Sequence, residues 1–166
     1  MFELKPLSKE AIPAALERAH RYRLLNEPVE AESICRDVLE VDPENQDALV
    51  TLLLALSDQF DEHLGHAGEE AKRVLARIRD EYSRVYHQGI VCERRAKSFL
   101  KRGGPRAKHQ SYEGFRQALE HFERAAALRP PGNDDAILRW NTCVRILRAN
   151  PELGPDQEVE ARHWLE

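Results

Sequence analysis

Two histidines and two glutamates lie close together in one short segment of the chain. His63 and His66 are three residues apart, and Glu69 and Glu70 follow them. Imidazole nitrogens and carboxylate oxygens are donors that zinc takes from proteins. Two histidines around a single glycine do not make a four-ligand set, and no second His or Cys pair completes one. We therefore expect a solvated loop here and no metal site.

Covalent catalysis would need an activated cysteine or serine. The cysteines, Cys35, Cys92 and Cys143, are 57 and 51 residues apart, which fits neither a disulfide framework nor a CxxC motif. We expect reduced and mostly buried thiols. A catalytic Cys–His pair stays open, although no local sequence nominates one. None of the seven histidines accompanies a Ser or Cys in a recognisable nucleophile motif.

The sequence also lacks the glycine-rich motifs that bind phosphate groups. It contains neither the P-loop pattern nor the G-x-G-x-x-G pattern of dinucleotide-binding folds. Its carboxylates, such as Glu30, Asp37 and Glu40, are spaced like the surface charges of a helix. We therefore expect a protein that is not an enzyme and that needs no cofactor.

One segment of the chain concentrates positive charge. The chain holds 29 acidic residues against 25 Lys and Arg, and residues 1–60 carry twelve acids against six bases. The basic stretch, by contrast, contains no acid; its members are Arg94, Arg95, Lys97, Lys101, Arg102, Arg106 and Lys108. Three interpretations of this stretch stay open: a solvated loop and helix end, a surface for an acidic peptide, or an RNA- or anion-binding site. Only Phe99 supplies an aromatic ring within it, which disfavours nucleic acid.

The elements that position these residues are predicted to be helices. Apolar residues recur three and four positions apart, as in Leu49, Leu52, Leu53 and Leu56, and no apolar–polar alternation of strand length occurs. Pro and Gly punctuation, including Gly65–Gly68 and Gly103–Gly104, divides the chain into seven helices and a tail. The expected helices cover about 9–25, 29–41, 43–60, 69–79, 82–100, 111–128 and 135–148. We expect one domain over residues 1–149 and a short helical tail over 150–166.

Two of these helices share a packing pattern. Ala31, Cys35, Val38 and Pro43 have the same spacing as Ala118, Phe122, Ala125 and Pro130, and Ala71, Leu75 and Ile78 form a degenerate copy without its Pro. The pattern resembles the second helix of the tetratricopeptide repeat. Tyr22 fills the aromatic position of the first helix, whereas Ala15 and Arg18 replace its Trp and Leu. The resemblance covers residues 12–148. It implies an all-α, right-handed superhelical stack of about three antiparallel helix pairs plus a capping helix.

In that family the first helices of the pairs line a concave groove that receives a partner segment. The positions that the resemblance assigns to the groove are His20, Arg23, Leu54, Asp58, Tyr86, Ile90, Arg94, Arg139 and Arg145. Chaperone-binding members hold a C-terminal carboxylate with a Lys–Asn–Asn–Lys–Arg set. The corresponding residues here are Leu16, His20, Leu54, Ser83 and His87. This departure disfavours binding to the C-terminus of a chaperone.

The resemblance therefore predicts a non-enzymatic protein–protein interaction module, a scaffold or adaptor that binds a protein or peptide. The alternative is an RNA- or anion-binding accessory protein that uses the basic stretch. A third class is a self-assembling subunit, for which Trp164 and Leu165 in the tail are candidate contacts. No apolar run is long enough to span a membrane, and residues 1–6 do not resemble a signal peptide. We accordingly expect a cytoplasmic location.

Overall fold

The computed structural model of the protein describes residues 2–154. Within that range the secondary structure is helical and contains no strand, which confirms the predicted all-α class. The predicted tail helix, from residue 155 onward, lies outside the described residues. The chain divides into two compact units, Met1–Arg79 and Asp80–Glu166, which we name unit 1 and unit 2. The sequence had predicted a single repeat domain over residues 1–149, and it gave no signal for the boundary after Arg79.

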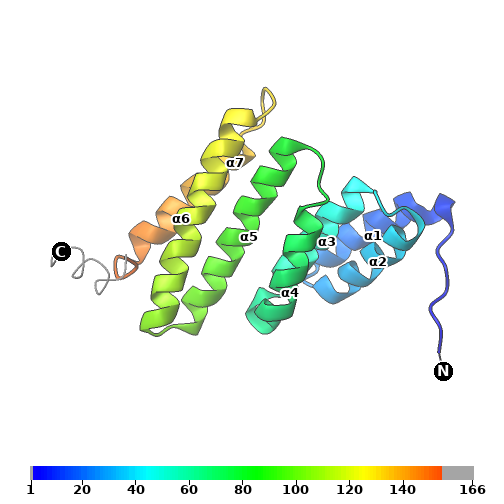
Figure 1. The fold of residues 1–166 in the computed structure, drawn as a ribbon, viewed down its shortest axis with the longest axis horizontal. Coiled ribbons are helices and arrows are strands. Elements are labelled where there is room, and N and C mark those ends of the chain that lie inside the picture. The colour runs from blue at the N-terminus through cyan, green and yellow to red at the C-terminus, as the bar shows by residue number, and fades with distance from the viewer. Residues whose placement is uncertain (1, 155–166) are drawn as a thin grey trace. The chain divides into compact units, whose positions relative to one another are not determined.

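Unit 1 contains a 3-10 turn and four α-helices (Figure 1). The turn is Lys9–Ala11, and the helices are α1 (Ile12–Leu24), α2 (Pro28–Val41), α3 (Gln46–Asp58) and α4 (Phe60–Leu75). Each helix packs against the next one, and α1 also touches α3. Ala31, Cys35 and Val38, three residues of the repeat pattern on α2, are completely buried. They lie in the core that α2 forms with its neighbours.

Unit 2 contains α5 (Glu81–Arg102), α6 (Pro105–Leu128) and α7 (Asp135–Ala149). Figure 1 shows α5 and α6 side by side over their whole length, and α7 packs against both of them. The repeat-pattern residues Ala118, Phe122 and Ala125 on α6 are completely buried, as their counterparts in unit 1 are.

Glycines set the spacing between α5 and α6. A Cβ added to Gly89 would lie 2.6 Å from Cε1 of Phe122, and one added to Gly114 would lie 2.9 Å from Cβ of Ala96. At the second contact, Ser111 donates a hydrogen bond to the Ala96 carbonyl at 2.9 Å. Only residues without a large side chain permit so close an approach of two helix backbones.

The predicted start of the third helix is wrong. Asp42 is the last, capping residue of α2, and Pro43 precedes α3 instead of opening it. The N-cap is Asn45, whose side chain accepts a hydrogen bond from the Ala48 amide at 2.9 Å. Asn45 caps α3 because its side-chain oxygen accepts a hydrogen bond from an amide that would otherwise lack a partner in the first turn.

The predicted break at Gly65–Gly68 is misplaced, because the backbone leaves helical geometry at His63 instead. The chain turns at Gln59, and both glycines lie inside α4, which is kinked at His63 (φ −132°, ψ 37°). Glycine in a helix costs about 1 kcal/mol relative to alanine. Burial of Phe60, Ala67 and Val74 along the same helix offsets that cost. His66 therefore lies in helical backbone, whereas His63 is the non-helical residue at the kink.

The sixth helix begins six residues earlier than expected. α6 starts at Pro105, directly after Gly103 and Gly104, both of which have positive φ angles. Proline suits the first turn of a helix because its missing N–H would have no partner there. As a result, Arg106 and Lys108 belong to the first turn of α6 and not to a loop.

We expect Gly114→Ala to destabilise the protein, because the added methyl meets the Ala96 backbone, which cannot easily shift. Overpacking of this kind lowers the free energy of unfolding by about 1–3 kcal/mol. The matched control is Gly68→Ala, where nothing lies within 4 Å of the added Cβ. There the better helix propensity of alanine raises the free energy of unfolding by about 0.5–1 kcal/mol. Urea unfolding followed by circular dichroism measures both, and a stabilising Gly114→Ala would contradict the tight α5–α6 contact.

Candidate functional site

In unit 1, α1 and α3 share a face on which charged side chains pair across the two helices. Arg23 Nε donates a hydrogen bond to Asp58 Oδ2 at 2.8 Å, and these side chains are only 18% and 22% exposed. One turn earlier on α1, His20 Nε2 lies 3.2 Å from Asp47 Oδ1, with both side chains about half exposed. The face therefore holds two cross-helix pairs, each with the basic side chain on α1 and the carboxylate on α3.

Leu54 lies between these pairs on α3. Residues 47, 51, 54 and 58 are three or four positions apart, so they form one stripe of the helix. Leu54 is half-buried within that stripe. Four predicted groove positions, His20, Arg23, Leu54 and Asp58, thus lie together on the α1–α3 face, which we name the unit 1 face.

In unit 2 a buried carboxylate organises the corresponding face of α5 and α7. The side chain of Glu93 on α5 is 0% exposed. Arg139 on α7 approaches both of its carboxylate oxygens at 3.4 Å, and Lys97, one turn further along α5, donates to Oε1. A buried charge is strongly unfavourable unless it is paired, so Glu93 requires these cations. Their side chains remain 39% (Lys97) and 36% (Arg139) exposed, which leaves part of each cation at the surface.

An aromatic group adjoins this charge cluster. The rings of Tyr82 and Tyr86 stack with centroids 5.8 Å apart, and the ring of Tyr86 also meets that of Phe122 at 6.0 Å. Burial opposes the charge of Arg139, but Glu93 and the Tyr86 phenol together hold its pKa above the usual value. We name Tyr82, Tyr86, Glu93, Lys97 and Arg139 the unit 2 face.

The remaining predicted groove positions of unit 2 are placed differently. Ile90 is buried in the core and supports the face from beneath. Arg94 is half-buried on α5. Arg145 is exposed, and its six-residue separation from Arg139 turns it about 120° around α7 from that residue. The structure therefore does not bring Arg145 to the Glu93 cluster.

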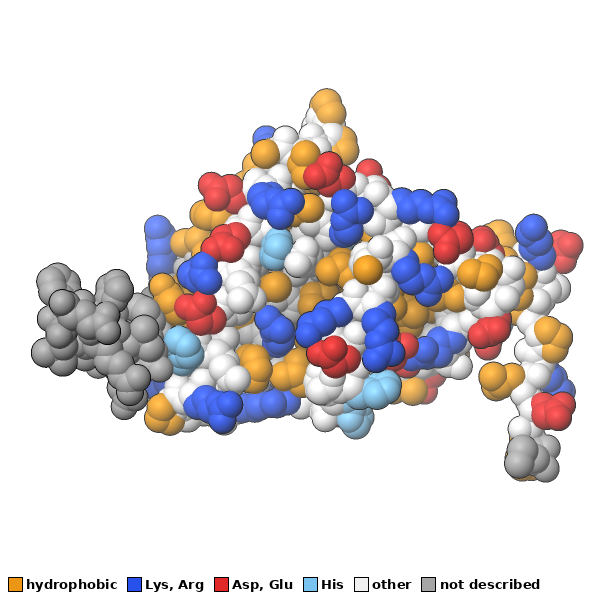
Figure 2. Space-filling view, in the orientation of Figure 1, with side chains coloured by type: hydrophobic (Ala, Val, Ile, Leu, Met, Phe, Trp, Pro, Cys, Tyr) orange, Lys and Arg blue, Asp and Glu red, His pale blue; other side chains and the backbone are white. Residues whose placement is uncertain are grey.

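The basic stretch divides into two groups. Arg94, Arg95 and Lys97 are half-buried along α5, and Arg95 donates a hydrogen bond to Gln117 of α6 at 3.1 Å. The other four residues are exposed around the α5–α6 turn; they are Lys101, Arg102, Arg106 and Lys108. We name these four the basic turn. Figure 2 shows cationic side chains gathered at the end of unit 2 where α5 meets α6.

The structure also places the candidate metal ligands and the three cysteines that the sequence singled out. His63 and His66 are exposed on α4, and no group of three or more metal-ligating side chains occurs in residues 2–154. Burial raises the pKa of Cys35 and of Cys143 to about 12, and it also raises the pKa of Cys92. Because the thiolate is the nucleophile, this burial disfavours the reactive form of all three thiols at neutral pH. Across the same residues, no helix is both long and apolar enough to cross a membrane.

Sequence reasoning missed Glu93 as the centre of the unit 2 face. The basic stretch was defined from Arg94 onward, so the acid directly before it was left out. The signal that could have found it is local, because Glu93 and Lys97 are four residues apart on a predicted helix. Its second partner, Arg139, is 46 residues away, and no spacing rule connects the two.

No family model matches the chain, and no curated protein or solved structure matches it either. The resemblance to tetratricopeptide repeats therefore stays a prediction from the residue pattern.

We expect Arg139→Met to destabilise unit 2, because it leaves the buried Glu93 with Lys97 as its remaining cation. Loss of a hydrogen-bonded charged partner costs about 1.5–3 kcal/mol in the free energy of unfolding. Arg145→Met is the matched control on the same helix, and we expect it to change this free energy by less than about 0.5 kcal/mol. Urea unfolding of both variants provides the measurement, and equal effects would show that the Glu93–Arg139 pair contributes nothing.

Proposed function

We propose that the protein is a non-enzymatic interaction module, a scaffold or adaptor, that binds a segment of a partner protein. Its helices form a tetratricopeptide-like array in which α1–α2, α3–α4 and α5–α6 are antiparallel pairs of a right-handed superhelix and α7 is the cap. The odd-numbered helices carry the partner-binding residues. The proposal includes the predicted cytoplasmic location, and it requires no cofactor.

The observation that carries this proposal is the charge cluster of the unit 2 face. The carboxylate of Glu93 is inaccessible to solvent. It pairs with Lys97 of α5 and with Arg139 of α7 and so fixes the positions of these two cations. One carboxylate and two cations leave a net charge of +1 at the surface. Lysine has three donors and arginine five, so both retain capacity for a further carboxylate. Sites that are pre-organised in this way bind with a smaller loss of side-chain entropy.

The charge of unit 2 favours an acidic partner. Unit 2, residues 80–166, contains fifteen Lys and Arg against thirteen Asp and Glu, and seven of these bases are concentrated in the basic stretch. An electrostatic potential of one sign steers a partner of the opposite sign towards its site. Tyr86, half-buried beside the cations, offers an aromatic surface to a neighbouring apolar side chain. The ligand that fits this face is a peptide segment in which an acidic residue lies near an apolar one.

A peptide-display selection against the full-length protein tests this function. We expect enriched peptides to contain Asp or Glu beside an apolar residue, and Lys97→Met to weaken their binding about tenfold, the equivalent of one charge-assisted hydrogen bond. Arg145→Met serves as the control and should leave affinity unchanged. Fluorescence anisotropy of labelled peptides gives the dissociation constants. Equal binding by all three proteins, or turnover of a small molecule without any peptide binding, would contradict the proposal.

The basic turn supports a second candidate function, binding of RNA or another polyanion. Its four exposed cations surround the start of α6, where the N-cap residue Gly104 supplies no side-chain cap. The first-turn amides of a helix and nearby cations both favour negative charge. The acid-free sequence from Arg94 to Lys108 adds to this potential.

Salt dependence distinguishes this second function from the first. If the basic turn binds single-stranded RNA, the triple variant Arg102→Glu, Arg106→Glu and Lys108→Glu should lose affinity. It should also lower the slope of log affinity against log salt by about 2, since each contact contributes about 0.7. Lys97→Met should leave RNA affinity nearly unchanged. Filter binding at roughly 50 to 200 mM salt measures the RNA affinity and its salt dependence. Absence of RNA binding by the wild-type protein would exclude this second function.

A further inference from the structure

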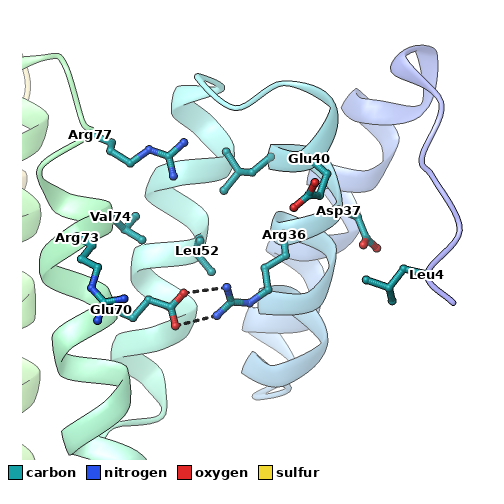
Figure 3. A pocket seen from close by; sticks show the side chains of 10 residues that line it. Leu4, Arg36, Asp37, Glu40, Leu52, Glu70, Arg73, Val74 and Arg77 are labelled. Atoms are coloured by element: carbon teal, nitrogen blue, oxygen red, sulfur yellow. Dashed lines mark hydrogen bonds and ion pairs between the residues drawn. The ribbon is translucent and has the colours of Figure 1, made fainter. Parts of the chain in front are cut away.

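In unit 1, opposite charges are paired where they lie. Across the cavity between α2 and α4, Arg36 and Glu70 form a two-pronged ion pair with N–O distances of 2.8 Å (Figure 3). Three bases and three acids line this cavity, so their charges cancel. The cavity is thus bridged by its own ion pair and offers no net charge to a partner.

Unit 2, by contrast, separates its charges along the chain. The basic turn is exposed, and the acids nearest to it in the sequence, Glu93 and Glu113, already pair with Lys97 and Arg116. From residue 150 onward the chain carries five acids against one base; the acids are Glu152, Asp156, Glu158, Glu160 and Glu166. The two segments therefore have net charges of opposite sign, and each attracts the other.

The fold returns the chain to the basic turn before most of these acids follow. α6 leads away from the turn and α7 runs back beside α6, so α7 ends towards the end of unit 2 where α5 meets α6 (Figure 1). Because α6 has 24 residues and α7 has 15, the end of α7 lies about 14 Å short of the level at which α6 starts.

The chain stays on the protein after α7 has ended. The Asn150 side chain donates a hydrogen bond to the Ile146 carbonyl at 2.8 Å, and the Leu153 amide donates to the Asn150 carbonyl at 3.0 Å. The side chain of Leu153 is only 7% exposed, so this turn is packed and does not project into solvent. It fixes the position of Gly154, the last described residue.

Three acids follow Gly154 within six residues. Six residues of extended chain span at most about 20 Å, which is more than the distance by which α7 falls short of the basic turn. Asp156, Glu158 and Glu160 occupy every second position. Side chains two positions apart lie on one side of an extended chain, so all three carboxylates can face the cations together.

We propose that residues 156–160, which we name the acidic segment, bind the basic turn of the same chain. Their carboxylates pair with the cations at the end of α5 and at the start of α6. The first-turn amides of α6 add to the attraction, because the N-cap residue Gly104 supplies no side-chain cap. Since the segment is tethered through Leu153, its effective concentration at the turn exceeds that of a free peptide in solution.

This pairing makes the acidic segment a built-in competitor at the basic turn. RNA or another polyanion must displace the segment before it binds there, which lowers its apparent affinity. The inference goes beyond the proposed function, since it concerns no residue of the unit 1 face or the unit 2 face except through the charge of the whole unit.

Zero-length crosslinking of the full-length protein tests this assignment. A carbodiimide joins a carboxylate to a lysine amine only where the two groups are in contact, and mass spectrometry of the digest identifies the pair. Unit 2 contains three lysines, Lys97, Lys101 and Lys108. We expect the acidic segment to be linked to Lys101 and Lys108, within one chain, and not to Lys97, which pairs with Glu93.

Neutralising the arginines of the basic turn shows whether charge holds the segment there. Arg102→Gln with Arg106→Gln keeps both lysines and should lower the crosslink yield about fivefold, the most that one exposed ion pair contributes. The matched control is Arg124→Gln with Arg145→Gln, which removes the same charge from exposed positions of α6 and α7. It should leave the yield unchanged.

A charge exchange provides a second check. Arg102→Glu with Arg106→Glu should abolish the links to Asp156, and adding Glu158→Arg with Glu160→Arg should restore them. The inference is overturned if the acidic segment is linked to Lys97 in place of the other lysines, if no link forms, or if the arginine variants leave the yield unchanged. Links between two chains also overturn it, because the occupant is then a second copy. None of these outcomes requires peptide or RNA binding, so the proposed function can hold while this inference fails.

Discussion

The close approach of α5 and α6 is the constraint on which the candidate site depends. Gly89 gives room to the ring of Phe122, and Gly114 lies against Ala96, so these helices pack with little between their backbones. Phe122 in turn supports the ring of Tyr86, and α7 packs on α6 so that Arg139 reaches Glu93. A larger residue at either glycine would move α5 away from α6, and with it the carboxylate that orders the unit 2 face. The helix packing therefore comes first, and the placement of charge follows from it.

Glu93 explains why this face can be pre-organised. A carboxylate without solvent contact is tolerated only with partners that satisfy it, and the cost of losing one keeps Lys97 and Arg139 in place. Long cationic side chains at a surface usually sample many rotamers, and fixing them costs free energy on binding. Here part of that cost is met on folding. The unit 1 face differs, because Arg23 and Asp58 neutralise each other and leave no net charge from that pair.

The sequence predicted most of the helices and the buried small residues, because both depend on local spacing. Ala31, Cys35 and Val38 repeat the pattern of α6 and are buried as that pattern requires. Helix ends were less predictable, since the break that Gly65 and Gly68 signal falls at His63 and both glycines are helical. The pairing of Glu93 with Arg139 joins residues 46 positions apart and follows from the arrangement of α5 and α7 alone. A break between the helices 69–79 and 82–100 follows from the local pattern, but no local feature shows that it also divides the chain into two units.

That division changes the meaning of the charge pattern. The sequence alone shows a basic stretch within an acidic chain, but the structural boundary separates sixteen acids and ten bases in residues 1–79 from thirteen acids and fifteen bases in residues 80–166. Each unit therefore has its own potential, and the unit 2 face lies in the positive one. The net charge of the Glu93 cluster and the net charge of unit 2 are both positive. Both favour an acidic partner segment, first as it approaches and then as it docks. On the unit 1 face the Arg23–Asp58 pair is balanced while the surrounding unit is negative, which disfavours an acidic ligand there. The two faces are thus chemically different, and under the proposed function an acidic partner is directed to the unit 2 face.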